Sequence, residues 1–371
     1  MYNELNKLIF RITDNKVIPA ISVAIGYRGD IIYSNSSGSI YEAGEKITST
    51  SKFDIASMTK ILTGICFMKL MEKKYINLYD PICEIFPEFA EKKPIEKNGK
   101  VIDYCDASKI NWYHVLTHTS GMGWTRPKTR PSLPNLNKGL ADIYNLPFLY
   151  QTGEHIIYSD IPIILMGVAM EKITGIKLDE LINTQICEPL DLGNTEYRRI
   201  SKTKADNPLD ILPTEYDTVF RKYRVWGEVH DENAFLLDGV AGHAGIFSSA
   251  EDMCNLAMAF ADCLKKDGIL SKETAKMMIK EQVVEDGDRR GLVWQLSGRS
   301  KNSYTRFLSS SAYGHSGFTG CFLWNDPQRD LSIVLLSNDV YNGRNNRKLF
   351  EYRENIMNFI IEEFDGMYRT K

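Results

Sequence analysis

The chain has 371 residues, of which 43% are hydrophobic and 25% charged, and its formal net charge at pH 7 is -3. This composition is that of an ordinary globular protein, and the length suggests two domains at roughly 150 residues each. Because the chain is slightly acidic and has no basic stripe, nucleic-acid binding is disfavoured.

The cysteines and the apolar runs indicate the compartment. Seven cysteines are scattered without a Cys-x-x-Cys pair, which disfavours a disulfide framework or zinc knuckle and favours a reducing compartment. Residues 1–16 lack the apolar core of a signal peptide, and runs such as 161–170 are too short to span a bilayer. We expect a cytoplasmic protein that does not associate with membranes, although a mature secreted chain given a new Met1 would look the same.

The N-terminal part predicts a helix followed by a hairpin. Apolar residues at helical spacing indicate a helix over residues 3–14. After Pro19, two β-prone runs at 20–27 and 31–36 flank the turn Arg28-Gly29-Asp30. A polar connection then leads to a helix that begins at Ser57.

The middle of the chain predicts mostly helix and loop, with few strands. Helices are indicated at residues 112–117, 162–174, 178–186 and 252–266, the second closed by Gly175. Residues 124–138 contain three prolines and predict an ordered loop.

Strand-prone runs return near the C-terminus, at 292–296, 318–324 and 331–336, and residues 347–364 predict a terminal helix. Strands at both ends with helices between them predict an α/β fold of the α+β sandwich type. We expect an antiparallel sheet, flanked by the N- and C-terminal helices, from residues 1–75 and 286–371. A mostly helical inserted domain would comprise residues 76–285.

One short motif can carry nucleophilic chemistry. In Phe-Asp-Ile-Ala-Ser-Met-Thr-Lys, Ser57 and Lys60 lie one helical turn apart, so hydroxyl and amine would share a face. A serine becomes a nucleophile when a base takes its proton, and a lysine can serve if burial or positive charge lowers its pKa. The alternative is that Ser57 caps the helix and Lys60 is a solvated first-turn lysine.

Two further stretches can be paired with Ser57. Residues 151–160 form a turn followed by Tyr158, just before an apolar helix. Residues 313–320 place glycines around His315 near a strand, where backbone N–H groups could approach a ligand closely. The alternative for Tyr158 is an aromatic residue packed in the core.

Together these motifs resemble the penicillin-recognising serine hydrolases: class C β-lactamases, D-alanyl-D-alanine carboxypeptidases and family VIII esterases. Ser57 and Lys60 match the family's Ser-x-x-Lys motif, Tyr158-Ser159-Asp160 resembles Tyr-x-Asn, and His315-Ser316-Gly317 resembles Lys-Thr-Gly. Supporting stretches that also look similar are residues 116–121, 188–195, 229–234 and 239–253. The resemblance spans roughly residues 15–360 in the family's order, and it implies the β-lactamase/transpeptidase-like fold.

The resemblance also implies a mechanism. Ser57 would attack a carbonyl while Lys60 and Tyr158 share its proton, and the N–H groups of Ser57 and Phe318 would bind the oxyanion. Tyr158 would then activate water against the acyl-enzyme. A phenol with a pKa of about 10 needs Lys60, and His315 as a further contributor, to lower that value.

Two positions depart from the family pattern. Asp160 replaces an asparagine, so its side chain can hold Lys60 protonated but cannot donate to a substrate carbonyl. His315 replaces a lysine, which makes the positive charge at that position depend on pH. The supporting site residues that the resemblance implies are Asp160, His315, Ser316, Gly317 and Phe318.

Other residues resemble metal ligands. His114 and His118 are four residues apart, but the glutamate that a zinc protease needs after the first histidine is absent. His230, Asp231 and His243 lack a recognisable ligand spacing. For His118 we expect local hydrogen bonding, and for the second set structural hydrogen bonding.

The predicted function is a serine hydrolase that forms an acyl-enzyme and cleaves small esters or peptides ending in a D-amino acid, as a carboxypeptidase or esterase with weak β-lactamase activity. It would use no cofactor and no metal, and its partner would be a small-molecule or short-peptide acyl substrate. Two alternatives stay open: a ligand-binding sensor of peptidoglycan fragments with reduced catalysis, and an acyltransferase using the same site. The oligomeric state is also open.

Overall fold

A nine-stranded antiparallel sheet dominates the fold. The computed structural model describes residues 2–124, 134–202, 208–298 and 303–368. The strand order is β3-β2-β1-β14-β13-β12-β11-β10-β9, so the two ends of the chain meet where β1 pairs with β14. The strands are β1 (Ala20–Tyr27), β2 (Asp30–Ile40), β3 (Glu45–Lys46), β9 (Val283–Glu285), β10 (Asp288–Arg290), β11 (Gln295–Leu296), β12 (Tyr313–Ser316), β13 (Phe322–Asp326) and β14 (Leu331–Ser337).

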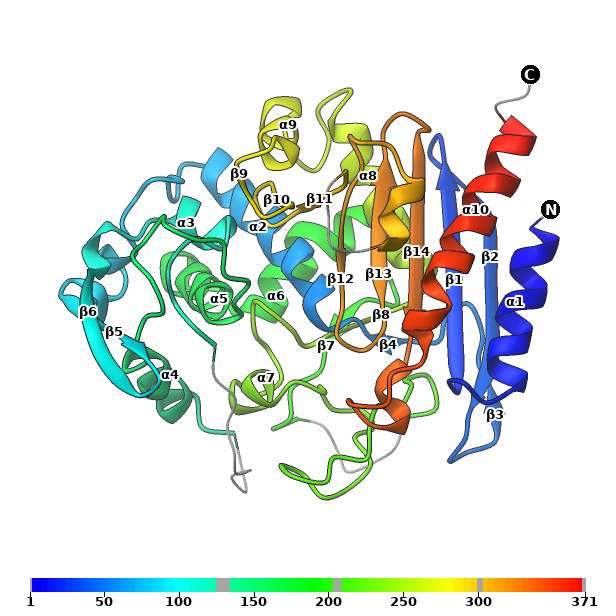
Figure 1. Ribbon diagram of the computed structural model, residues 1–371, viewed down its shortest axis with the longest axis horizontal. Helices are drawn as coiled ribbons and strands as arrows, with labels where there is room; N and C mark the ends of the chain where they lie inside the picture. The colour runs from blue at the N-terminus through cyan, green and yellow to red at the C-terminus, as the bar shows by residue number, and fades with distance from the viewer. Residues whose placement is uncertain (1, 125–133, 203–207, 299–302, 369–371) are drawn as a thin grey trace.

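Helices cover both faces of this sheet, because successive side chains of a strand point to opposite faces. In β1, Ile21 and Val23 pack with the terminal helices α1 (Asn3–Asp14) and α10 (Arg353–Tyr368) in one buried cluster. Ala24, on the other face, belongs to the core that includes α8 (Ala250–Cys263). Figure 1 shows α1 and α10 side by side on the outer face, with the helical part of the chain on the other side. The predicted fold class is confirmed.

The helical part comes between the two sheet-forming segments in the sequence, and Figure 1 shows it on one side of the large sheet. Its helices are α2 (Thr59–Glu72), α3 (Trp112–Leu116), α4 (Leu136–Tyr144), α5 (Ile161–Thr174), α6 (Leu178–Ile182), α7 (Glu232–Leu236) and α9 (Lys272–Ile279). Two small sheets accompany them: β4 (Phe53–Asp54), β8 (Ile246–Ser248) and β7 (Glu196–Tyr197) in one, and β5 (Lys92–Lys97) and β6 (Lys100–Asp106) in the other. The division into two domains at 75/76 and 285/286 stays a prediction.

Several predicted elements are confirmed. The N-terminal helix has the predicted bounds, and β1 and β2 form a hairpin in which Arg28 and Gly29 take the positive φ values of a tight turn. Helix α5 ends at Gly175, whose φ of 72° is the left-handed C-cap conformation. The helix predicted at 178–186 is shorter, because a π-helical turn, Asn183–Cys187, follows α6.

Other predictions were wrong. Residues 318–324 are not one strand: a turn at 317–320, with Gly320 at φ 112°, separates β12 from β13. Since Phe318 is apolar, the sequence pattern continued through this turn. The terminal helix begins at Arg353, after a short 3-10 turn.

Two segments of the middle part differ from the expected loop and helix. The hairpin of β5 and β6 was missed, although Asn98-Gly99, both at positive φ, is a hairpin-turn sequence. Of the loop predicted at 124–138, residues 125–133 lie outside the described residues, and α4 begins at Leu136. All seven cysteines are free thiols. Within the described chain, no helix is both long and apolar enough to cross a bilayer.

Candidate active site

Ser57 lies at a sharp change from strand to helix. Strand β4 leads into the 3-10 helix Ala56–Met58, which continues as α2. Ala56 has a φ of 47°, a strained conformation for a residue with a Cβ, and the Asp54 carboxylate holds it by accepting the Ala56 N–H at 2.8 Å. Ser57 makes no side-chain capping bond to α2, so the capping alternative is wrong.

Lys60 lies directly behind this serine and is not solvated. Its side chain is 0% exposed. The ammonium donates to the Ser57 Oγ at 2.9 Å and to the His243 carbonyl at 3.2 Å, and it pairs with the Asp160 carboxylate at 2.7 Å. Asp160 is the N-cap residue of α5, yet its side chain makes no capping bond and turns to Lys60 instead. The predicted pairing of Ser57 with Lys60 is therefore present.

The pKa of Lys60 is raised, whereas from the sequence we considered that burial could lower it. Burial does favour the neutral amine, but the Asp160 carboxylate and the Tyr158 phenol outweigh it, and the pKa of Lys60 is raised above 10.5. Lys60 is therefore an ammonium ion at neutral pH. In this state it is a hydrogen-bond donor and a positive charge, and it cannot accept a proton from Ser57.

Tyr158 faces two cations. The Lys60 Nζ lies 5.0 Å from the centroid of its ring and the Arg290 Cζ lies 5.5 Å from it. The tyrosine is 39% exposed, so the alternative of an aromatic residue packed in the core is wrong. Tyr158 therefore lies between the Lys60 ammonium and the Arg290 guanidinium at the edge of the site.

His315 is buried and carries no charge at physiological pH. Its Nδ1 lies 2.8 Å from the Ser316 carbonyl, so Nδ1 carries the proton. Burial, followed by the charges of Lys60 and Arg290, lowers the pKa of His315 to about 3. The expectations that this position charges with pH and that it helps lower the pKa of Tyr158 are therefore wrong within the physiological range.

The turn after His315 lies against the segment that precedes Ser57. A Cβ added to Gly317 would come within 2.4 Å of the Ile55 carbonyl oxygen, which shows how closely the two backbones approach. Thr319 donates its hydroxyl to the Asp54 carbonyl at 2.7 Å. Chain segments far apart in the sequence are thus joined next to Ser57, as the motifs predict.

Comparison with known proteins places this arrangement in a family. The β-lactamase family model matches residues 5–357.

The chain belongs to the β-lactamase family.

Relatives and solved structures agree with this assignment. The chain is 30% identical to a putative D-alanyl-D-alanine carboxypeptidase of Escherichia coli (strain K12), over 94% of this chain and 82% of the relative. It is 30% identical to an N-acetylmuramyl-L-alanine amidase of Bacillus subtilis (strain 168), over 82% of this chain and 73% of the relative. The predicted resemblance is confirmed.

Two solved structures share the fold. EstCE1, described as a hydrolase with promiscuous acyltransferase activity, has a TM-score of 0.72 at 20% identity and covers 95% of this chain and 99% of its own. The octameric penicillin-binding protein homologue from Pyrococcus abyssi has a TM-score of 0.70 at 20% identity and covers 94% of this chain and 76% of its own. At such identities the likeness shows the β-lactamase-family fold alone.

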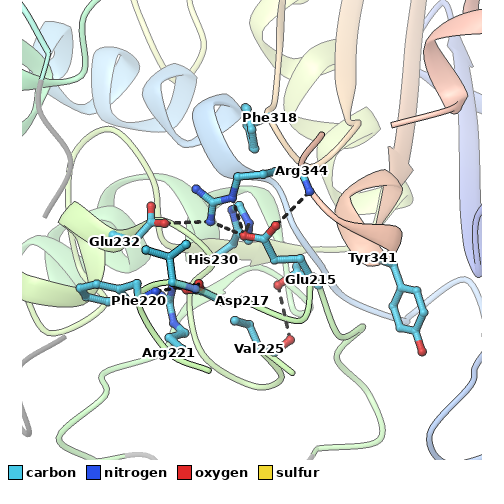
Figure 2. Close-up of polar contacts among 12 residues, drawn as sticks. Glu215, Asp217, Phe220, Arg221, Val225, His230, Glu232, Phe318, Tyr341 and Arg344 are labelled. Atoms are coloured by element: carbon cyan, nitrogen blue, oxygen red, sulfur yellow. Dashed lines mark hydrogen bonds and ion pairs between the residues drawn. The ribbon is translucent and has the colours of Figure 1, made fainter. Parts of the chain in front are cut away.

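A charged network that was not predicted from the sequence lies beneath Phe318. The Phe318 ring stacks on His230 at 5.7 Å between centroids, and His230 bonds the Glu215 carboxylate at 3.0 Å. Arg344 bridges Glu215 at 2.7 Å and Glu232 at 2.8 Å (Figure 2). Although burial opposes it, hydrogen bonds from His230 and Arg344 lower the pKa of Glu215 to about 2. The network therefore supports the Phe318 ring through His230.

Arg347 holds Phe318 from another side. Its guanidinium lies 4.4 Å from the Phe318 ring centroid and donates to the Phe318 carbonyl at 2.7 Å. Because that carbonyl belongs to the turn after His315, Arg347 fixes the peptide next to the predicted oxyanion donor. No sequence motif marked this arginine.

One cluster of the described residues could hold a metal ion. Ligand atoms of Asp160, Asp231 and His243 lie within 4.8 Å of one another. However, the Lys60 ammonium already pairs with Asp160, and His243 Nε2 bonds Asp231 at 2.8 Å. His230 likewise bonds a carboxylate. The cluster is therefore a hydrogen-bonded ion-pair network, and the expected structural hydrogen bonding of His230 and His243 is confirmed.

The histidines of α3 and the residues just after it have separate partners. His114 Nδ1 accepts locally from the Asn111 N–H at 3.3 Å. The prediction that His118 bonds locally is wrong for its side chain. Its Nδ1 accepts a hydrogen bond from the Ser159 N–H at 3.4 Å, and Ser159 is 41 residues away in the sequence. The cause is the fold, which packs the end of α3 against the loop that carries Tyr158.

Proposed function

We propose that this member of the β-lactamase family is a serine hydrolase that forms an acyl-enzyme at Ser57. The observation that carries the proposal is the 2.9 Å contact between a buried Lys60 ammonium and the Ser57 Oγ. A cation at this distance stabilises negative charge that develops on the serine oxygen during attack.

We assign to Tyr158 the acceptance of the Ser57 proton. Its ring lies beside Lys60 and Arg290, and Asp160 keeps Lys60 charged, so Lys60 itself is not the acceptor. Ser57 Oγ bonds to the substrate carbonyl carbon, and the tetrahedral oxyanion accepts hydrogen bonds from the N–H groups of Ser57 and Phe318. Tyr158 returns its proton to the leaving group, and then takes one from the water that breaks the acyl-enzyme.

The substrate is a small ester or a short peptide ending in a D-amino acid. Two relatives at 30% identity are named a putative D-alanyl-D-alanine carboxypeptidase and an N-acetylmuramyl-L-alanine amidase, and these names support an amide substrate that contains alanine. Asp160 accepts hydrogen bonds but cannot donate to a substrate carbonyl, which favours a substrate with an N–H at that position. Since His315 is neutral and Asp160 cannot donate, β-lactam hydrolysis is expected to be weak.

The test combines active-site labelling with a substrate panel. Wild type and Ser57→Ala are treated with a fluorophosphonate, and the panel contains p-nitrophenyl esters, D-Ala-D-Ala peptides, N-acetylmuramyl-L-alanine peptides and nitrocefin. Stoichiometric labelling that is lost in Ser57→Ala, with turnover of at least one ester or amide, supports the proposal. Folded wild type that neither labels nor turns over any substrate contradicts it and favours the sensor. Products formed with an added alcohol or amine distinguish hydrolysis from acyl transfer.

A further inference from the structure

We propose that His118 is the positioning residue for Tyr158, holding the phenol in place for the proton transfers described above. The contacts between His118 and Tyr158 are observed in the structure, whereas the effect of His118 on proton transfer rests on the proposed function. Nothing in the Ser-x-x-Lys, Tyr-x-Asn or Lys-Thr-Gly motifs includes His118.

His118 contacts three consecutive residues centred on Tyr158. Its backbone carbonyl accepts the N–H of Ile157 at 2.8 Å, and its Nδ1 accepts the N–H of Ser159 at 3.4 Å. Between these two bonds, the imidazole lies 4.7 Å from the Tyr158 ring, with an angle of 41° between the planes. One residue thus fixes the backbone on both sides of Tyr158 and packs against its ring.

The backbone of His118 is held in a conformation that makes this possible. Its φ is 59°, in the left-handed region, where a residue with a Cβ stays only if its surroundings hold it. The N–H of His118 donates to Val115 at 3.3 Å, and the N–H of Thr119 donates to His114 at 2.9 Å. Thr119 in turn accepts from Gly153 at 2.7 Å, which ties the turn to the loop that carries Tyr158.

The imidazole is neutral and its remaining nitrogen faces inward. Because Nδ1 accepts a hydrogen bond, Nε2 carries the proton. Burial and the charges of Arg290 and Lys60, together with His315, lower the pKa of His118 well below 6.5. Among the described residues, Nε2 of His118 and Nε2 of His315 are both buried without a hydrogen-bond partner, one a donor and the other an acceptor.

The buried rings of His118 and His315 both pack against the Tyr158 ring. The His315 ring lies 5.9 Å from the Tyr158 ring and the His118 ring 4.7 Å from it. Tyr158 precedes α5 and has no helical hydrogen bonds of its own to fix it. Its orientation toward Lys60 therefore depends on His118, and a phenol misplaced by about 1 Å can lose on the order of a hundredfold in rate.

The test compares His118→Asn with His114→Asn. Asparagine tolerates the left-handed backbone conformation but lacks the ring, and His114 lies on α3 with a local bond to Asn111 and no contact to Tyr158 in the described geometry. We measure the single-turnover rate of Ser57 labelling by a fluorophosphonate from pH 5 to 10, and kcat and KM for an ester. His118→Asn is expected to lower the labelling rate and kcat by about 10- to 100-fold with KM within about twofold, and to change the pH profile. His114→Asn is expected to match wild type.

A second readout does not need activity. The ring resonances of ¹³C-labelled Tyr158, assigned with Tyr158→Phe, should shift and broaden in His118→Asn and stay unchanged in His114→Asn. If His118→Asn keeps the wild-type labelling rate, pH profile and Tyr158 resonances, the proposal is overturned. If wild type is not labelled at Ser57, the proposed function fails, whereas the Tyr158 resonances still decide whether His118 positions the ring.

Discussion

The Asp160 carboxylate lies 2.7 Å from the Lys60 ammonium, directly behind the nucleophile. Where the family motif has an asparagine, this chain therefore supplies a negative charge that keeps Lys60 protonated. In the proposed mechanism this ion pair separates two roles: Lys60 supplies a positive charge and a hydrogen bond, and Tyr158 moves the proton. Four predictions test this arrangement and the elements that support it.

Asp160→Asn should change both the charge of Lys60 and the stability of the protein. Without the carboxylate, the pKa of Lys60 falls because burial disfavours the ammonium, and this favours the neutral amine, which can act as a base. We expect nitrocefin acylation to rise relative to ester hydrolysis, because the amide can donate to a substrate carbonyl. Removing one partner of a buried pair should also lower the free energy of unfolding by about 3 kcal/mol, measured by urea denaturation.

The control for the stability effect is Lys138→Ala, which removes an exposed ion pair between Lys138 and Asp142 on α4. That variant should lose less than about 1 kcal/mol. A similar small loss in Asp160→Asn, with an unchanged ratio of nitrocefin to ester rates, would show that the Asp160 charge does not control Lys60.

Tyr158→Phe should remove the proton acceptor while leaving the pocket intact. The ring contacts to Lys60 and His118 are kept, so KM should change little, whereas kcat should fall by about 10²- to 10⁴-fold. Steady-state kinetics on an ester that wild type hydrolyses checks this. Full activity in Tyr158→Phe would mean that another group takes the Ser57 proton.

Gly317→Ala should displace the turn that carries the predicted oxyanion donor. Its Cβ would approach the Ile55 carbonyl oxygen to 2.4 Å, so the turn that carries Phe318 must shift relative to the backbone that precedes Ser57. Loss of one oxyanion donor lowers kcat by roughly a hundredfold or more. Gly193→Ala, where a Cβ meets nothing within 4 Å, is the control and should keep wild-type kcat. Equal kcat values in both variants would exclude this turn from the reaction.

His315 should make the protein sensitive to acid. Its pKa is about 3 in the folded protein and about 6.5 when unfolded, so its contribution to stability is present above pH 6.5 and is lost as the pH falls toward 3. Between pH 7 and pH 4 the free energy of unfolding should therefore decrease by about 2–3 kcal/mol more in wild type than in His315→Asn.

His155 should have the opposite effect on the pH dependence of stability, and it serves as the comparison for His315. Its bond to Glu285 raises its pKa, so its contribution is present below pH 6.5 and is lost as the pH rises through the folded value. Urea denaturation of His315→Asn and His155→Asn, from pH 4 to a pH above the folded pKa of His155, checks both signs. Parallel pH dependence in wild type and His315→Asn would show that His315 is not held neutral by the fold.

The parts of the protein that follow from local patterns could be predicted from the sequence. Strand alternation and helical spacing are local properties, so β1, β14 and α1 were predicted, and Ser57 and Lys60 are only one helical turn apart. The turn at 317–320 was not predicted. Its apolar residue Phe318 continues the strand pattern, although it lies in the turn between β12 and β13.

Contacts between distant residues could not be predicted in the same way. The charge of Lys60 depends on Asp160, which α5 places beside it. The support of Phe318 depends on the bond between Arg344 and Glu215, which are 129 residues apart. The position of Tyr158 is proposed to depend on His118. These pairings carry no sequence spacing that marks them. Asn98-Gly99 is different, since its turn sequence was visible and was overlooked.

The most direct test of the acyl-enzyme is rapid-quench mass spectrometry with an ester or amide that the protein turns over. We expect the acyl group on the peptide containing Ser57 within the first turnover, decaying as product forms, and no adduct in Ser57→Ala. Consumption of substrate with no adduct on Ser57, or with equal rates in Ser57→Ala, would contradict nucleophilic catalysis by this serine.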